Sequence, residues 1–390
     1  MKRLLLVSHR SIDQAGGPAA RWRSFVHHLP KYGWEVDVLA ARSRASAGEF
    51  GQEESERRRT ALRAQVMSRV GKIASPAFGL AGVRPEAMPL STAWIPRAAA
   101  QVRRRVESGR YDAVLATGPP FASLIAARMA TRAGAIPFVV ELRDLWAGNP
   151  SFDRGGRVLS GLENWVFRGS QAVVAMTPEA TEDLGGRHPE LAGHVHEIAN
   201  GFEPELLERR STLSALGRPI EILHSGTLTA DRPLAPLLHA LSPDFRLVLH
   251  GYVAPEIRRE IEQSGVPVEI VLPSGWEDAV SRIAATDVAL VTQARGAGDE
   301  TAVAAKVYEY LALGKPVLCI SDGGATEALL RRLEADRLCA HLDNPGSIQA
   351  ALERIRAGDL PKPVAPEQLA PYERPRLAQI LAELLDTLAA

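Results

Sequence analysis

Residues Ala302–Ile320, AVAAKVYEYLALGKPVLCI, decide how this chain folds. Apolar residues recur every three or four positions in the first half of the stretch, which predicts a helix with one buried face. Gly314 ends this helix because the chain there needs a residue that tolerates a positive φ, and Pro316 cannot continue it. The apolar run Val317–Ile320 then predicts a short, buried, parallel strand. The predicted apolar face of the helix comprises Ala302, Val303, Val307, Tyr310 and Leu311.

Two residues of opposite charge lie on the same predicted helix. Lys306 and Glu309 are three positions apart, so their side chains share a face one turn apart. An exposed pair of this kind stabilises a helix by only about 0.2–0.5 kcal/mol. On spacing alone, an ordinary surface ion pair is at least as well supported as a binding site, because exposed pairs are the commoner case.

The segment KVYEYLALGKPV resembles the signature of the retaining GT-B glycosyltransferases of family four. This resemblance implies an α/β fold of two Rossmann-like domains, with parallel sheets that face a central cleft. It also implies that Glu309 binds the ribose hydroxyls of a nucleotide-sugar donor. Where the family often has a first Glu, eight positions earlier, this chain has Thr301, preceded by Asp299 and Glu300.

Length and composition favour two globular domains. The chain has 390 residues, which is long for a single core, and 46% of them are hydrophobic and 24% charged. No apolar run reaches the roughly 18–20 residues of a membrane span, and the chain begins directly with a predicted strand, so we expect no signal peptide. Two cysteines, Cys319 and Cys339, do not make a disulfide framework. We therefore expect a cytoplasmic protein.

Charge is distributed unevenly along the chain. Residues 1–200 contain 27 Lys and Arg against 19 Asp and Glu, and the remaining residues contain 19 against 27. The first part therefore favours anionic partners, although nothing indicates nucleic acid. Residues 43–96 are rich in Arg, Ser, Gly and Ala. They are either a solvated insertion or a basic amphipathic surface that docks on an acceptor or on anionic lipid at the inner face of a membrane.

A strand, a glycine loop and a helix open the chain. The apolar run Leu4–Ser8 is followed by a loop and by a predicted helix from about Ala19 to Leu29, the order in which a Rossmann-like domain begins. Gly16 and Gly17 let backbone N–H groups approach a ligand, and a helix start favours an anion. A glycine pair is equally typical of a plain turn, and the dinucleotide motif is absent. The resemblance implies that Gly16, Gly17 and Arg21 lie near the donor diphosphate and the acceptor.

A charged pair follows another predicted strand, Pro137–Leu142. Arg143 and Asp144 come directly after it, where parallel sheets hold their ligands. An Arg–Asp pair that only holds the loop is the alternative. The sequence RDLW resembles the family loop that lines the sugar and acceptor site, which implies that Asp144 contacts the acceptor or the transferred sugar. A general-base role for Asp144 toward an acceptor hydroxyl is a second expectation.

Three histidines, His188, His194 and His196, suggest a metal cluster at first sight. They lack Cys or carboxylate partners at the fixed spacing of a metal site, so we predict loop and surface histidines and no metal. The sequence Asn200-Gly201-Phe202 resembles the hinge of the family, with Glu203 where the family has Asp.

A second Rossmann-like domain is predicted to begin at the strand Ile220–Ser225. Arg232 comes shortly before a predicted helix, where a cation clamps a diphosphate well, although Arg232 alone is equally consistent with a structural role. The resemblance implies that Gly226, Thr227 and Arg232 bind the diphosphate, with Thr227 in place of one of two expected cations. In the loop 295–301, Asp299 or Glu300 would bind sugar hydroxyls.

These patterns combine into a domain plan. We predict an N-terminal acceptor-binding domain at 1–203, a linker at 204–218, a C-terminal nucleotide-sugar-binding domain at 219–368, and a final helix at 369–390 that crosses back to the first domain. The apolar spacing of residues 372–388 supports that final helix.

The function implied is retaining, metal-independent transfer of a sugar from a nucleotide-sugar, with UDP or GDP as the expected nucleotide and no cofactor. Arg232 and Lys306 would stabilise the leaving diphosphate, with Asp144 at the acceptor. The acceptor would be a hydroxyl of a glycan, a lipid-linked sugar or a natural product, in a bacterial cell. Two alternatives stay open: a nucleotide-sugar epimerase on the same fold, which needs paired acids and a catalytic His, and a catalytically idle GT-B partner protein.

Overall fold

The computed structural model describes residues 1–12, 17–41, 94–131, 136–149, 157–210, 216, 219–272, 275–293 and 300–390. Of the residues predicted to be functional, Gly16 and Asp299 lie outside these ranges, as do residues 43–93 of the basic segment.

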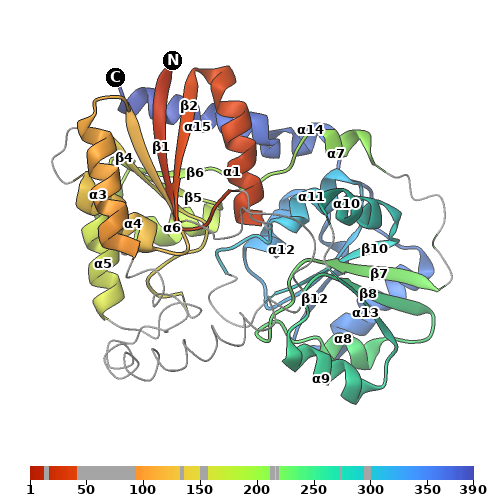
Figure 1. Ribbon diagram of the computed structural model, residues 1–390. Coiled ribbons are helices and arrows are strands. Elements are labelled where there is room, and N and C mark those ends of the chain that lie inside the picture. The colour runs from red at the N-terminus through yellow and green to blue at the C-terminus, as the bar shows by residue number, and fades with distance from the viewer. Residues whose placement is uncertain are drawn as a thin grey trace, which may run out of the picture. The chain divides into compact units, whose positions relative to one another are not determined.

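The described residues form two compact units, each built on one parallel sheet (Figure 1). The chain passes between the units more than once, inside α6 (Pro178–Arg187) and inside α15 (Arg374–Leu388). Of the predicted linker 204–218, residues Glu205–Glu208 form the short helix α7, which belongs to the second unit. The first unit comprises Met1–Ala175, Leu184–Glu197 and Gln379–Ala390, and the second comprises Met176–Asp183 and Ile198–Ala378.

The sheet of the first unit has six parallel strands in the order β2-β1-β3-β4-β5-β6. The central strands are continuous apolar runs that are buried on both faces, as strands covered by helices on each side must be. The predicted Rossmann-like opening is thus confirmed. The strands are β1 (Lys2–Ser8), β2 (Trp34–Ala40), β3 (Ala113–Gly118), β4 (Phe138–Leu142), β5 (Ala172–Ala175) and β6 (Val195–Glu197).

Helices cover both faces of this sheet. Right-handed connections place α1 on one face and α3, α4 and α5 on the other, as Figure 1 shows. The helices are α1 (Gly17–His28), η1 (Leu29–Tyr32), α3 (Trp94–Glu107), α4 (Ala122–Ala130), α5 (Arg157–Phe167) and η3 (Pro189–Leu191), together with α6.

The second unit repeats the plan with the strand order β12-β11-β10-β7-β8-β9, again all parallel. Its strands are β7 (Ile220–Ser225), β8 (Phe245–His250), β9 (Val268–Val271), β10 (Val288–Thr292), β11 (Val317–Ser321) and β12 (Cys339–His341). Its helices are α8 (Ala235–Ala240), α9 (Pro255–Ser264), α10 (Trp276–Ala285), α11 (Lys306–Ala312), α12 (Ala325–Arg332), η4 (Asp336–Leu338), α13 (Pro345–Ala357), α14 (Pro366–Leu369) and η5 (Ala370–Tyr372), with α7 and α15.

The stretch that organises the sequence forms α11, a glycine turn and β11. Gly314 has φ +74°, as the sequence predicted. The helix begins four residues later than predicted, because the Ala302 carbonyl accepts a hydrogen bond from the Thr326 side chain instead of entering a helical ladder. Ala302 and Val303 therefore precede the helix, although the Val303 side chain is still buried.

The final helix, α15, contributes to both units. Its last turn lies on the first unit, where Asp386 accepts hydrogen bonds from Lys2 (3.0 Å) and from the Trp34 indole (2.9 Å). At its start, in the second unit, Arg374 contacts Glu203. Across the described ranges, every helix is too short or too polar to cross a bilayer.

Candidate functional site

The second sheet reverses its strand order at β7, which has β8 on one side and β10 on the other. Ligands of open α/β sheets bind at such a switch point, beyond the carboxyl ends of the strands. Gly226 and Thr227 follow β7 there and are both exposed. Gly226 has φ +123° and its N–H donates to the His250 carbonyl at the end of β8 (2.7 Å). The turn is therefore fixed, with accessible backbone at the switch point.

Lys306 reaches the inner side of this turn. It is the first residue of α11 and is half-buried. Its Nζ lies 2.9 Å from Nε2 of His224, a buried residue of β7. A Cβ added to Gly226 would lie 3.1 Å from the same Nζ, so the glycine and the ammonium group are in direct contact.

Arg232 adds a second cation to this cluster. Its Nη1 donates to the Thr292 carbonyl at the end of β10 (3.1 Å). Burial, followed by repulsion from Arg232, lowers the pKa of Lys306 to about 7, against the opposing pull of Glu309. Burial and the same two cations lower the pKa of His224 well below its usual value, so this imidazole is neutral and accepts from Lys306. The site thus concentrates positive charge, the electrostatic requirement of an anion site.

Glu309 lies one turn along α11 from Lys306 and is half-buried. Burial raises its pKa, while Arg374, Lys306 and a hydrogen bond from Trp276 lower it and the charge of Glu203 raises it. The carboxylate therefore stands among cationic and donor groups beside the Lys306 cluster. Such a carboxylate can accept hydrogen bonds from a polyhydroxyl ligand.

Sequence reasoning missed the residues that surround Glu309. Glu203 and Arg374 arrive there because residues 202 and 373 form an isolated bridge and the Phe202 N–H donates to the Tyr372 carbonyl (3.0 Å). No local pattern could have indicated this contact, since the two segments are far apart in the sequence. The only signal for His224 was a polar residue within a buried strand.

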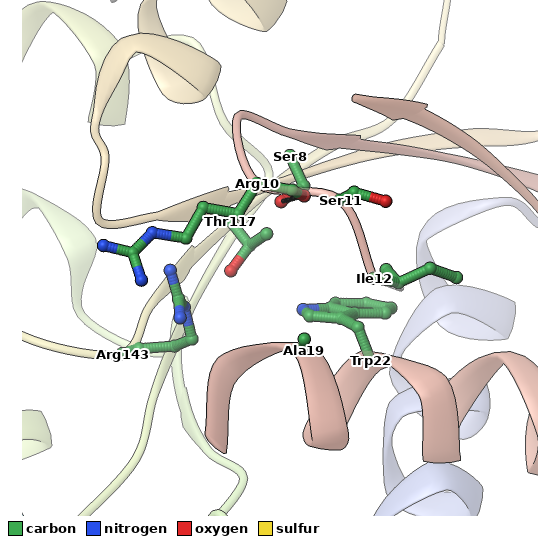
Figure 2. Close-up of a pocket in the computed structure, with 8 residues that line it drawn as sticks. All are labelled: Ser8, Arg10, Ser11, Ile12, Ala19, Trp22, Thr117 and Arg143. Atoms are coloured by element: carbon green, nitrogen blue, oxygen red, sulfur yellow. Dashed lines mark hydrogen bonds between the residues drawn. The ribbon is translucent and has the colours of Figure 1, made fainter. Parts of the chain in front are cut away.

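A small pocket occupies the corresponding place in the first unit (Figure 2). It lies at the carboxyl ends of β1, β3 and β4, where β1 stands between β2 and β3 and the order of that sheet reverses. Its lining residues are Ser8, Arg10, Ser11, Ile12, Ala19, Trp22, Thr117 and Arg143.

Arg143 is the predicted residue that the pocket contains. Its guanidinium donates to the Pro119 carbonyl, while its buried Nε has no hydrogen-bond partner in the described part of the chain. Burial lowers the pKa of Arg143, Arg10 and Arg21 lower it further, and Glu141 and Asp144 oppose the shift. Asp144 follows in the chain and is half-buried, but it does not line the pocket.

Arg21 lies near Arg143 but does not line the pocket. Its side chain is 1% exposed and its Nε donates to Glu141 Oε1 (3.0 Å), so the guanidinium forms a buried ion pair instead of lining the pocket. The other oxygen of Glu141 accepts from the Trp22 indole (2.7 Å). Arg21 therefore neutralises Glu141, and Glu141 fixes the position of Trp22.

The prediction for His188 was wrong. His188 is 4% exposed, and its Nε2 lies 2.9 Å from Glu163, which also accepts from Arg187 and from the Ala147 N–H. Burying a carboxylate requires such partners, and only the fold supplies them. His194 is exposed, as predicted. In the part of the chain that the structure describes, no group of three or more His, Cys, Asp or Glu could hold a metal ion.

The structure thus divides the predicted residues into two sets, one in each unit. Lys306, Glu309, Arg232, Gly226 and Thr227 come together at the switch point of the second sheet. Arg143 lines the pocket of the first unit, beside Asp144, and Gly17 is the first residue of α1. Glu300 is exposed, with its carbonyl bonded to the N–H of Ala325 at the start of α12 (3.0 Å).

Comparison with known proteins agrees with this architecture. Residues 16–201 match the glycosyl transferase 4-like domain family. No curated protein sequence matches the chain.

Several solved structures share the whole fold at low sequence identity. HepE of Anabaena, solved with UDP and glucose, is 14% identical over 100% of both chains, with a TM-score of 0.66. The α,α-trehalose-phosphate synthase (UDP-forming) of Burkholderia vietnamiensis is 13% identical, over 99% of this chain and 100% of that one, with a TM-score of 0.67. The UDP-GlcNAc 2-epimerase of Methanocaldococcus jannaschii is 10% identical over 99% and 100%, with a TM-score of 0.56. Residues 16–201 thus resemble the glycosyl transferase 4-like domain, and the fold of the chain is GT-B.

Proposed function

We propose that this protein transfers a sugar, with retention of anomeric configuration and without a metal ion, from a nucleotide-sugar donor to an acceptor hydroxyl. The observation that carries this proposal is the close approach of two cations, Lys306, which contacts the Gly226 turn, and Arg232, which lowers the pKa of Lys306. Two cations beside accessible backbone at a switch point suit a diphosphate. The crystallisation of HepE with UDP and glucose supports a nucleotide-sugar as the ligand of this fold.

In this proposal the diphosphate lies against Lys306 and Arg232, with the backbone at Gly226 and Thr227 as additional partners. Glu309 accepts hydrogen bonds from the ribose hydroxyls. Its neighbours Arg374 and Trp276 favour the ionised carboxylate, the form that accepts at both oxygens. UDP is the first nucleotide to test and GDP the second.

The chemical role of the cations follows from where charge develops. When the bond from the sugar to the diphosphate breaks, negative charge grows on the leaving phosphate. Lys306 and Arg232 stabilise that charge without having to move, because the His224 and Thr292 contacts already hold them. Asp144 contacts the acceptor or the transferred sugar, and a more specific form of this proposal is that it acts as general base toward the acceptor hydroxyl. Gly17 lies near the ligand. Glu300, beside Asp299, binds sugar hydroxyls.

Nucleotide binding is the first test of the proposal. We expect UDP to raise the melting temperature, because a ligand that binds only the folded chain stabilises it, and the same screen includes GDP, TDP and ADP. Lys306→Met should abolish the increase, whereas Lys362→Met, an exposed lysine of the same unit, should leave it unchanged. Equal responses of the two variants would refute the assignment of the site.

Product stereochemistry distinguishes the functions that share this fold. A retaining transferase gives a product with the anomeric configuration of the donor, which NMR of the glycoside establishes. An inverted product would contradict retention. Conversion of the nucleotide-sugar into its epimer, with no acceptor present, would identify an epimerase. This function is tested because the fold is similar to that of a UDP-GlcNAc 2-epimerase. UDP binding without turnover would indicate the idle partner protein.

A further inference from the structure

The pocket of the first unit has a cationic lining. It includes Arg10 and Arg143, and none of the eight described residues that line it is acidic. Figure 2 shows both guanidinium groups on the same side of the pocket, with the Thr117 hydroxyl between them and the Trp22 ring. The arrangement therefore offers several donors to one small volume.

Two of these donors are buried without a partner. Among the residues that the structure describes, neither the Arg143 Nε nor the Thr117 Oγ1 has a hydrogen-bond partner, and Thr117 is only 2% exposed. Buried polar groups in folded proteins are almost always bonded, because a lost partner costs free energy on burial. Both residues line the pocket, so an acceptor group placed there is a candidate partner for these atoms.

Of the carboxylates that the structure describes nearby, neither Glu141 nor Asp144 takes this place. Glu141 has one oxygen bonded to Arg21 and the other to Trp22, so both are occupied, and Glu141 does not line the pocket. Asp144 attracts Arg143 but lies outside the lining. Arg10 is exposed and its charge repels that of Arg143, so an anion between the two guanidinium groups would relieve this repulsion.

We propose that this pocket binds an anionic group, a phosphate or a carboxylate, carried by the sugar acceptor. The substrate class of the first unit is then an acidic or phosphorylated saccharide. Trp22 and Ile12 supply an apolar wall beside the anion, against which the body of such an acceptor packs (Figure 2). This inference rests on the proposed glycosyl transfer, while the donor diphosphate is assigned to Lys306 and Arg232 in the other unit.

Small anions test the pocket without turnover. Inorganic phosphate is titrated by ³¹P NMR and labelled acetate by ¹³C NMR, in the Lys306→Met background so that the donor site does not contribute. We expect saturable broadening with at least one of the two anions, and the anion that binds more tightly identifies the charged group. Neither anion binding in this background would overturn the proposal.

Variants then locate the bound anion. Arg143→Gln and Thr117→Val should each weaken binding about tenfold or more, and Thr117→Val keeps the shape of the side chain in case Arg143→Gln does not fold. Arg103→Gln is the matched control, since Arg103 is an exposed arginine of α3 in the same unit. Equal binding by Arg143→Gln, Thr117→Val and Arg103→Gln would also overturn the proposal.

Thermal-shift measurements with UDP distinguish the acceptor assignment of the pocket from a donor assignment. In chains with an intact Lys306, Arg143→Gln and Thr117→Val should leave the thermal shift with UDP unchanged, because the pocket does not hold the diphosphate. Loss of the UDP response in both variants would show that the pocket serves the donor and would contradict the acceptor assignment. Failure of UDP to bind the natural chain would refute the donor site alone.

Discussion

Lys306 has a strongly lowered pKa, which results from its burial and its charged neighbours in the second unit. A lysine whose pKa is about 7 has lost much of its hydration and faces another cation, here Arg232. Its contact with His224 offers only a neutral acceptor in return. The folded chain thus holds an ammonium group in an environment that an anionic ligand would improve, which is why we expect ligand and proton to bind together.

The affinity for UDP should therefore fall as the pH rises above about 7. The diphosphate moves the pKa of Lys306 from about 7 back toward 10.5, so binding takes up a proton at any pH between these values. Affinity is then fully present below pH 7 and falls by up to about tenfold per pH unit above it. Calorimetric titrations from pH 7.5 to 9 measure this, above the range near pH 6 in which a terminal phosphate titrates.

Lys306→Arg supplies the control for this pH dependence. Arginine stays charged throughout the range, so the affinity of this variant for UDP should be flat from pH 7.5 to 9. A slope of the same size in Lys306→Arg would assign the proton to another group.

Glu309 should contribute to binding only when the ligand has a ribose. Hydrogen bonds to a charged group contribute about 1.5–3 kcal/mol, so Glu309→Ala should weaken UDP binding by about 10- to 150-fold. Pyrophosphate lacks the ribose and should bind this variant at least as tightly as the natural chain, because a negative charge near Lys306 has been removed. Calorimetry with both ligands makes the comparison, and an equal loss for UDP and pyrophosphate would show that Glu309 acts only by supporting the cations.

At the scale of elements, the positions of the loops after β7 and β8 depend on a close approach of Gly251 to the Gly226 carbonyl. A Cβ at Gly251 would lie 2.3 Å from the Gly226 carbonyl, and Gly251 has φ +135°. Any side chain there would push the donor-site turn away from β8. The position of the turn therefore depends on a glycine that contributes no group to the ligand.

Gly251→Ala should destabilise the protein by about 2–5 kcal/mol, the sum of positive-φ strain of about 1–2 and overpacking of about 1–3 kcal/mol. Gly265→Ala is the matched control, since Gly265 has φ +68° and a Cβ added there would have no neighbour within 4 Å, so that only the strain of about 1–2 kcal/mol applies. Urea denaturation of both variants measures the difference. Equal losses in the free energy of unfolding would mean that the Gly226 turn accommodates the added methyl group without a loss of stability.

Most elements followed from local sequence because parallel strands buried on both faces are continuous apolar runs. β7 has the predicted bounds, whereas the three-residue strands β6 and β12 were not predicted, since so short a segment has no period to detect. The start of α11 was misplaced because a side chain from α12 holds the Ala302 carbonyl. Boundaries therefore failed where tertiary contacts decided them.

The same distinction holds for the two sites. Lys306, Glu309 and Arg232 could be named as candidates because each lies in a local motif, and the fold groups them around Lys306. Their binding of a ligand stays a prediction. Arg374 beside Glu309, and Thr117 beside Arg143, carried no such signal, since each depends on pairing between distant segments. The buried ion pair of Arg21 carried no such signal either, because its partner, Glu141, lies 120 positions away.

At the scale of the whole molecule, each unit has its own site at the switch point of its own sheet. Both sites are cationic, but they are built differently. The site at Lys306 combines cations with the carboxylate of Glu309, as a ligand with both phosphate and hydroxyl groups requires, whereas the described residues that line the pocket at Arg143 include no acidic one. Two units with separate sites should respond separately to two ligands.

Hydrogen exchange can record these two responses in a single chain. UDP should slow exchange in peptides that cover residues 224–232 and 304–312, because these amides lie at the proposed donor site. Phosphate should slow exchange in peptides of the first unit that cover residues 8–12 and 117–121. Phosphate protection in the first unit should survive Lys306→Met and disappear in Arg143→Gln, whereas UDP protection in the second unit should show the opposite pattern. Each ligand stabilises only the conformations to which it binds, so protection that spreads equally over both units with UDP alone would show that the two sites do not act independently.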